Sequence, residues 1–252
     1  MPNHVTTRCI VTGPDEEVAR FRAKMIVTLQ DKDEFIGTLR EPYTCFDFNQ
    51  IIPMPEILWS SESSSVAEEG VILIMLRAEH RVAFADGGLV PTIDRIRQDV
   101  QMPERPIYEV ADAFLTKHPR YEELGIKRLK AIVETGYSDW YSWSIAHWKT
   151  KWNSYSFELV SESPLEFTFD TAWSFPQPIF EKLTEEFPSL HFECSSFDEG
   201  WGFGADGFFN PPEGKQPFTY YRGGENNGEI PDGLYQKVYH EDPPVYEDED
   251  TD

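Results

Sequence analysis

The 252-residue chain is predicted to form an α+β fold in which an antiparallel sheet carries helices on one face. Short segments rich in β-branched and alternating apolar residues stand near the N-terminus and again after residue 154. Amphipathic helical segments lie between them, and a block of consecutive helices at 66–136 interrupts the series. Outside that block the order is strand, helix, strand, then strand, strand, helix, strand. This order is typical of an antiparallel sheet covered by helices.

The first element is a strand at 5–12, VTTRCIVT, whose β-branched residues favour extended structure. A Gly-Pro pair ends it, and Asp15 is predicted to be the N-cap of the helix that follows. Val18, Phe21 and Met25 recur at helical spacing in that helix, which predicts one buried face.

Less regular structure is expected after this helix. Residues 31–41 are predicted to form a loop or an irregular helix, and 46–53 a short extended segment stopped by prolines. Asp47 and Asn49 in that segment suit a local turn network, or alternatively a pair of ligands. The serine-rich stretch 60–65 is expected to be a linker.

Residues 66–136 are predicted to be a helical insertion. Its four expected helices lie at 66–85, from residue 92, at 107–117 and at 121–135, and Gly136 is the expected C-cap of the last. The insertion also carries a basic cluster, which consists of Arg120, Lys127, Arg128 and Lys130. This cluster is either a solvated helix face or a patch that contacts an acidic partner, such as the acidic tail of the same chain.

The segment 140–173 holds five of the seven tryptophans of the chain. Burial of so much aromatic surface is strongly favourable, so this segment is expected to form the centre of the core. It is also the predicted join between the helical insertion and the sheet.

The C-terminal part is predicted to complete the sheet. Strands at 155–159 and 167–171 should form a hairpin around 161–164, and a helix at 178–187 should follow. Further strands are expected around residues 190–194 and 201–203. The predicted core therefore comprises 1–60 and 137–210, followed by add-on strands or loops at 211–240, including 218–221 and 234–239, and by a disordered acidic tail at 241–252.

The net charge of −23 is the most informative property of the whole chain. The last fourteen residues hold seven acids, and the rest still carries −16. Nucleic acid and anionic membranes should repel such a protein, whereas a basic partner should be attracted; solubility alone would also explain the charge. No signal peptide is recognisable, and the longest apolar run, 71–76, is too short to span a bilayer.

Cysteine usage indicates a reducing compartment. The three cysteines, Cys9, Cys45 and Cys194, contain no CxxC pair, which argues against a disulfide framework and against a zinc site. We therefore expect a soluble protein in a reducing cytoplasm.

Five segments together resemble the YubB-like (Api-type) family. They are MPNHVTTRCIVTG at the start, FDFNQIIPMP at 46–55, WSIAHWKTKWNSY at 143–155, FTFDTAWSFPQPIFEKLTEEFP at 167–188 and DEGWGFG at 198–204. The resemblance implies a ferredoxin-like domain and an origin on a bacteriophage, plasmid or genomic island, and hence the cytoplasm of a bacterial host. The fold name implies no iron–sulfur cluster, which three scattered cysteines would not ligate in the usual four-cysteine way. The resemblance supplies no catalytic residue.

No motif predicts catalysis, a cofactor or a metal: GxSxG, paired histidines and the phosphate-binding GxxxxGK[ST] are absent from the sequence. The best candidate binding site lies in the aromatic segment and comprises His147, Trp148, Lys151, Trp152, Asn153, Asp170 and Trp173. Trp148 and Trp152 would be four apart on a helical turn, and Lys151 would pair with Asp170. Alternatively, the tryptophans are core residues, and Asn153 and Asp170 bridge backbone groups.

Two functions follow from these observations. The first is a non-enzymatic acidic protein-binding module, in one form a counter-defence factor or DNA mimic, whose partner is a host or phage protein with a basic surface. It would bind neither nucleic acid directly nor a membrane. The alternative is a small-ligand or nucleotide-processing enzyme with its site between Trp148 and Trp173.

Overall fold

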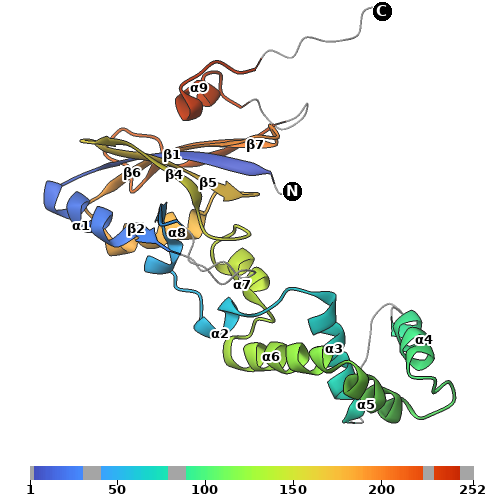
Figure 1. The fold of residues 1–252 in the computed structure, drawn as a ribbon. Coiled ribbons are helices and arrows are strands. Elements are labelled where there is room, and N and C mark those ends of the chain that lie inside the picture. The colour runs from blue at the N-terminus through green and yellow to red at the C-terminus, as the bar shows by residue number, and fades with distance from the viewer. Residues whose placement is uncertain (1–2, 31–40, 79–88, 224–229, 245–252) are drawn as a thin grey trace, which may run out of the picture. The chain divides into compact units, whose positions relative to one another are not determined.

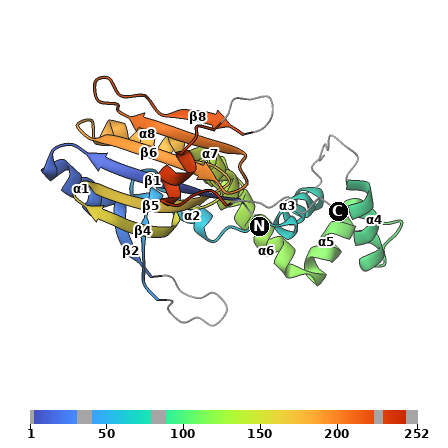
Figure 2. The ribbon, with the colours of Figure 1, turned by 90° about the horizontal axis from the view of Figure 1, so that it is seen from above.

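A computed structural model describes residues 3–30, 41–78, 89–223 and 230–244, without the side chains of 89–91 (Figures 1 and 2). The chain divides into two compact units. The larger comprises Met1–Pro53 and Ser144–Asp252, and the smaller comprises Met54–Trp143.

The larger unit contains a six-stranded sheet in the order β4-β5-β1-β6-β7-β8, with every neighbouring pair antiparallel. The strands are β1 (His4–Thr12), β4 (Tyr155–Glu162), β5 (Leu165–Ala172), β6 (His191–Asp198), β7 (Phe203–Phe209) and β8 (Thr219–Arg222). The sequence β1-α1-β4-β5-α8-β6 is the βαββαβ arrangement of ferredoxin-like domains, and β7 and β8 extend the sheet (Figure 2). The predicted α+β fold with an antiparallel sheet is confirmed.

Helices α1 (Asp15–Met25) and α8 (Gln177–Glu186) lie against one face of this sheet, which we call the inner face (Figure 1). Phenylalanines fill the space between them: the Phe21 ring lies 5.4 Å from that of Phe192, and the Phe180 ring lies 5.0 Å from that of Phe175. Each fully buried phenylalanine contributes roughly 2–3 kcal/mol. The amphipathic spacing predicted this packing correctly.

The N-cap prediction for the first helix is wrong. Pro14 occupies the N-cap position of α1, and Asp15 is the first helical residue. An N-cap needs extended backbone, and proline holds it there without offering a side-chain acceptor. The carboxylate of Asp15 still interacts favourably with the positive end of the helix dipole.

A third helix, α9 (Leu234–Tyr239), lies on the opposite or outer face of the sheet (Figure 1). The segment 234–239 was predicted to be an add-on strand, and this prediction is wrong. Its aromatic and β-branched residues resemble a strand, but Leu234 and Val238 are one helical turn apart and pack together against Phe197. The other predicted add-on strand, at 218–221, corresponds to β8.

A second, two-stranded sheet pairs β2 (Ile26–Leu29) with β3 (Tyr43–Phe46). The extended segment predicted at 46–53 is wrong beyond Phe46, because a 3₁₀ turn, η1 (Phe48–Gln50), follows. Asp47 Oδ1 accepts hydrogen bonds from the backbone N (3.0 Å) and from Nδ2 (3.1 Å) of Asn49, which is the predicted turn network. The loop predicted at 31–41 lies almost wholly outside the described residues.

The smaller unit is helical. It contains α2 (Glu56–Trp59), α3 (Ser65–Arg77), α4 (Leu89–Asp99), α5 (Ile107–Lys117) and α6 (Pro119–Thr135), and α7 (Trp140–His147) begins in it. Its core includes Leu73, Ile96, Val110 and Phe114. Gly136 adopts the left-handed C-cap conformation, as predicted, with φ 80°. The predicted helix at 66–85 is confirmed to Arg77, and 79–88 lie outside the described residues.

The basic cluster of α6 is largely neutralised within its own unit. Arg120 pairs with Glu62, Lys127 with Glu123 (2.8 Å) and Arg128 with the buried Asp139 (2.9 Å). These contacts favour the interpretation of a helix face with local ion pairs.

All three cysteines are buried thiols, and Cys9 lies directly opposite Cys194, with the sulfurs 3.8 Å apart. None of the described helices is long and apolar enough to cross a membrane.

Candidate functional site

The predicted site residues separate into core residues and surface residues. Trp148 is a core residue: it is 3% exposed, its Nε1 donates to the carbonyl of Ile52 (2.9 Å), and its ring packs edge-on against Phe48. Helix α7 ends at His147, which is half-buried, and Lys149 has a left-handed φ of 66°. The predicted helical turn from Trp148 to Trp152 is therefore wrong.

Asn153 also has a structural role. Its Nδ2 donates to Asp47 Oδ1 (2.6 Å), and its Oδ1 accepts from the backbone N of Phe48 (2.9 Å). The side chain thus joins the segment before β4 to the turn after β3, as the alternative interpretation of this residue predicted.

Lys151, Trp152 and Trp173 meet at the surface. The ammonium of Lys151 lies 4.6 Å from the ring centre of Trp152 and 5.2 Å from that of Trp173, which are cation–π distances. The two tryptophans are 36% and 40% exposed. The predicted ion pair between Lys151 and Asp170 is wrong: Asp170 instead accepts from the hydroxyl of Thr6 (2.8 Å).

Asp170 belongs to a row of side chains across the outer face. Register places Tyr155, Asp170, Thr6 and Phe197 directly opposite one another on β4, β5, β1 and β6. The Tyr155 hydroxyl shares a 2.6 Å hydrogen bond with Nδ1 of His4. The ring of Trp152 lies edge-on to Tyr155 at 6.4 Å. The row therefore connects the exposed tryptophans with the middle of the sheet.

A second aromatic group stands on the far side of this row. Trp201, which is 40% exposed, stacks on Tyr235 of α9 at 5.7 Å and 9°, and both rings contact Phe197. Tyr239 also packs on Phe197. Aromatic side chains thus flank Asp170 and Thr6 from two directions.

Two carboxylates lie between the aromatic groups. Burial, together with the charges of Asp170 and Glu199, raises the pKa of Tyr155 to about 12. Burial and the same two carboxylates also raise the pKa of Tyr239, against an opposing hydrogen bond with Thr6. Asp170 and Glu199 therefore both act electrostatically on these two phenols.

Both carboxylates accept hydrogen bonds from uncharged donors. Glu199 accepts from the backbone N of His4 (2.7 Å), and Asp170 from Thr6. Of the ion pairs within the described residues, none includes either carboxylate. Elsewhere on the outer face, Glu166 pairs with Arg8 (2.7 Å), and Lys237 pairs with Glu193 and Asp206 (2.9 and 2.7 Å).

We call this region the sheet-end surface. It comprises His4, Lys151, Trp152, Tyr155, Asp170, Trp173, Glu199 and Trp201. The backbone here is unusual, because Trp173 and Trp201 have left-handed φ values of 77° and 58°. Bulky residues rarely adopt this conformation, and such strain concentrates at functional sites.

The sequence analysis missed His4, Tyr155, Glu199 and Trp201. They come from segments up to 197 positions apart, and only the sheet register brings them together. A signal was nevertheless present, since all four lie in segments that carry the family resemblance.

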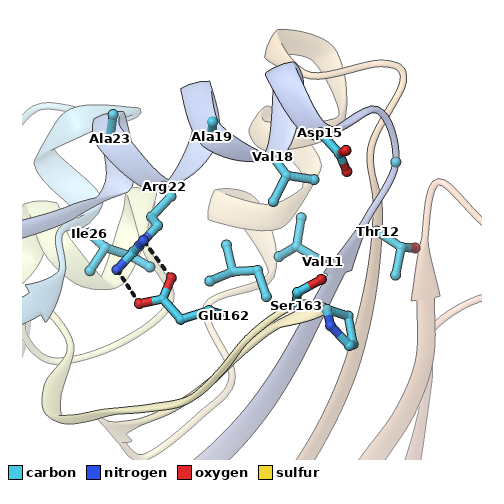
Figure 3. Close-up of a pocket in the computed structure, with 13 residues that line it drawn as sticks. Val11, Thr12, Asp15, Val18, Ala19, Arg22, Ala23, Ile26, Glu162 and Ser163 are labelled. Atoms are coloured by element: carbon cyan, nitrogen blue, oxygen red, sulfur yellow. Dashed lines mark hydrogen bonds and ion pairs between the residues drawn. The ribbon is translucent and has the colours of Figure 1, made fainter.

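A separate groove of about 780 Å³ lies between α1 and the turn that joins β4 to β5 (Figure 3). Apolar and polar side chains line it, and an ion pair between Arg22 and Glu162 (2.5 and 2.8 Å) bridges the two elements. Among the described residues no three His, Cys, Asp or Glu side chains are grouped to hold a metal ion.

One solved structure and one family model are similar to this chain. The crystal structure of protein api92 from Yersinia pseudotuberculosis matches with 11% identity and a TM-score of 0.36, over 89% of this chain and 100% of that one. No curated protein matches the chain. Residues 147–216, which run from the end of α7 beyond β7, match the family described as the ferredoxin-like domain in Api92-like protein. This part of the chain is therefore similar to the ferredoxin-like domain of Api92-like proteins.

Proposed function

We propose that the protein is a non-enzymatic acidic binding module that engages a basic surface of a partner protein through the sheet-end surface. One observation carries the proposal. Three half-exposed tryptophans, Trp152, Trp173 and Trp201, lie at the same end of the sheet as two carboxylates, Asp170 and Glu199, that have no cationic partner among the described residues. Tryptophan is enriched at binding hot spots, and carboxylates beside aromatic rings suit an arginine or lysine.

Charge supports the same kind of partner. Residues 144–252 contain 22 Asp and Glu against six Lys and Arg, so most of the net charge of −23 belongs to this part of the chain. A field of one sign accelerates association with a partner of the opposite sign and makes the rate depend on salt.

We place the protein in the cytoplasm of a bacterial host, as the product of a phage or plasmid that acts on a host or phage protein. Counter-defence is one role that such a binding module would serve. DNA mimicry receives less support, because a mimic needs rows of unpaired carboxylates. On the outer face Glu166, Glu193 and Asp206 are paired with cations of the same chain. No contact of the described residues favours the enzymatic alternative between Trp148 and Trp173.

The test is affinity capture from host lysate at low and high salt, with three variants of the full chain. Asp170→Asn combined with Glu199→Gln removes both charges, and Trp173→Gly removes an exposed ring while relaxing a left-handed backbone. Trp59→Ser is the matched control, because Trp59 is 66% exposed and belongs to the smaller unit.

We expect a basic protein to be captured by the wild type and by the control, at least tenfold less by the other two variants, and less at high salt. Equal capture by all four proteins, or capture that high salt does not weaken, would contradict the proposal.

A further inference from the structure

The groove beside α1 has space because the helix presents small residues to it. Ala19 and Ala23 are exposed on this side of α1 (Figure 3). The half-buried Val18 and Ile26 supply apolar surface, and the buried Val11 and Leu165 lie beneath the same groove. A volume of about 780 Å³ is in the usual range for ligand sites. The groove therefore offers room and apolar contact for at least one large aliphatic side chain.

The two ends of the groove differ in charge. At one end the guanidinium of Arg22 binds both carboxylate oxygens of Glu162, which offsets both charges (Figure 3). Asp15 stands at the other end, and its carboxylate forms no hydrogen bond or ion pair with the described residues. The remaining charge at the rim is negative. An occupant with a cation beside its apolar part would complement it.

We infer that this groove binds a peptide segment of a partner protein in which an apolar side chain stands next to a lysine or arginine. The apolar side chain lies between α1 and the turn that joins β4 to β5, and the cation faces Asp15. The hydroxyls of Thr12 and Ser163 line the same groove and can bind the peptide backbone. The open groove between a helix and a strand turn suits a chain that passes through it.

This site is distinct from the sheet-end surface. Val11 and Thr12 are at the C-terminal end of β1, whereas His4 is at its N-terminal end. At about 3.4 Å per residue, the two ends are roughly 27 Å apart. Both sites favour a basic partner, but neither needs the other, so the two proposals can fail separately.

The probe is a fluorescein-labelled peptide with one leucine between two lysines, titrated into the full ¹⁵N-labelled chain. Fluorescence polarisation gives the affinity, and amide chemical shifts locate the site. We expect shifts at Val18, Ala19, Ala23 and Leu165. Peptides with glutamates in place of the lysines, or serine in place of the leucine, should bind at least tenfold more weakly.

Two variants test the contacts. Ala19→Leu fills the groove and should weaken binding at least tenfold, whereas Ala146→Leu, at an exposed position of α7, is the matched control and should not change it. Both substitutions exchange good helix formers. Asp15→Asn should weaken binding about two- to fivefold, as expected for an exposed ion pair.

Unchanged binding to the Ala19→Leu variant, equal binding of the glutamate peptide, or shifts confined to His4, Tyr155 and Trp173 would overturn the groove proposal. The last result would leave the proposed function standing. Shifts at the groove with no effect at the sheet-end surface would support the groove alone.

Discussion

Asp139 joins the end of α6 to the start of α7. Its Oδ2 pairs with Arg128 (2.9 Å), and its Oδ1 accepts from the backbone N of Ser142 (2.8 Å) in the first turn of α7. The residue is 3% exposed. Burial opposes ionisation, but hydrogen bonds from Ser142 and Ser138 and the charge of Arg128 outweigh it, so the pKa of Asp139 lies below its usual value.

Asp139→Asn is expected to lower the free energy of unfolding by about 2–3 kcal/mol at neutral pH, because it leaves Arg128 partly buried without its counter-charge. A carboxyl with a lowered pKa stabilises the fold above its unfolded pKa, and the effect is lost as pH falls through the folded pKa. The gap between variant and wild type should therefore shrink below about pH 4. Urea unfolding at several pH values measures it, with the exposed Glu134→Gln as control. A gap that stays constant to pH 2 would contradict this role.

Trp173 and Trp201 each combine an unfavourable backbone conformation with an exposed aromatic ring. Each occupies a left-handed position that glycine would hold with less strain, and each remains 40% exposed. Packing explains Trp201 only in part, because its ring stacks on Tyr235 and contacts Phe197 but stays largely exposed, and an exposed ring gains less from burial than a core ring. Both exposed rings belong to the sheet-end surface, through which the protein is proposed to bind its partner.

At the scale of elements, the crossing of α3 and α6 depends on two glycines that face each other. A Cβ at Gly125 would lie 2.6 Å from the carbonyl carbon of Gly70, and a Cβ at Gly70 would overlap the carbonyl oxygen of Tyr121. The helix backbones therefore touch directly, which no residue with a side chain allows.

Gly70→Ala is expected to destabilise the smaller unit by about 3 kcal/mol, although alanine favours helix by about 1 kcal/mol over glycine. Lys130→Ala, at an exposed position of α6, should change stability by less than about 0.5 kcal/mol. Calorimetry of both variants measures the effect. If Gly70→Ala were as stable as the wild type, the close crossing would be wrong.

Elements with strong local periodicity were predictable from the sequence. The spacing of Phe21 and Met25 and the apolar side of α8 gave both inner-face helices, and Gly136 marked the end of α6. Helix α9 was not predictable, because six residues with mixed propensity acquire helical structure by packing on Phe197. Tertiary context overrides local preference in such short segments.

The candidate site was predictable only in part. The aromatic segment correctly drew attention to Lys151, Trp152 and Trp173, but a single left-handed residue, Lys149, ends the helix on which the expected geometry rested. The pairing of β4, β5, β1 and β6 sets the contact between Tyr155 and His4, and a local pattern does not encode such a long-range register.

At the scale of the whole molecule, the helical unit is a long insertion between two segments of the sheet unit. The chain leaves the sheet unit at Pro53 and returns at Ser144. Within the larger unit, hydrogen bonds join the segment that ends at Pro53 to the segment that begins at Ser144. Trp148 Nε1 donates to Ile52 O, and the Asn153 side chain bonds to Asp47 and Phe48. The two segments of the larger unit are thus held together by contacts that do not involve residues 54–143.

Replacing residues 54–143 by a short Gly/Ser linker is therefore expected to leave the larger unit folded, because the closing contacts and the phenylalanine core remain. Calorimetry of the full chain should show two transitions, and the shortened chain only one. That transition should stay within a few degrees of its counterpart in the full chain, since loop length adds only about 0.6 kcal/mol per doubling. The Trp148→Phe variant of the shortened chain, which loses the bond to Ile52, should unfold at a lower temperature. A shortened chain without a cooperative transition would show that the sheet unit needs the helices to fold.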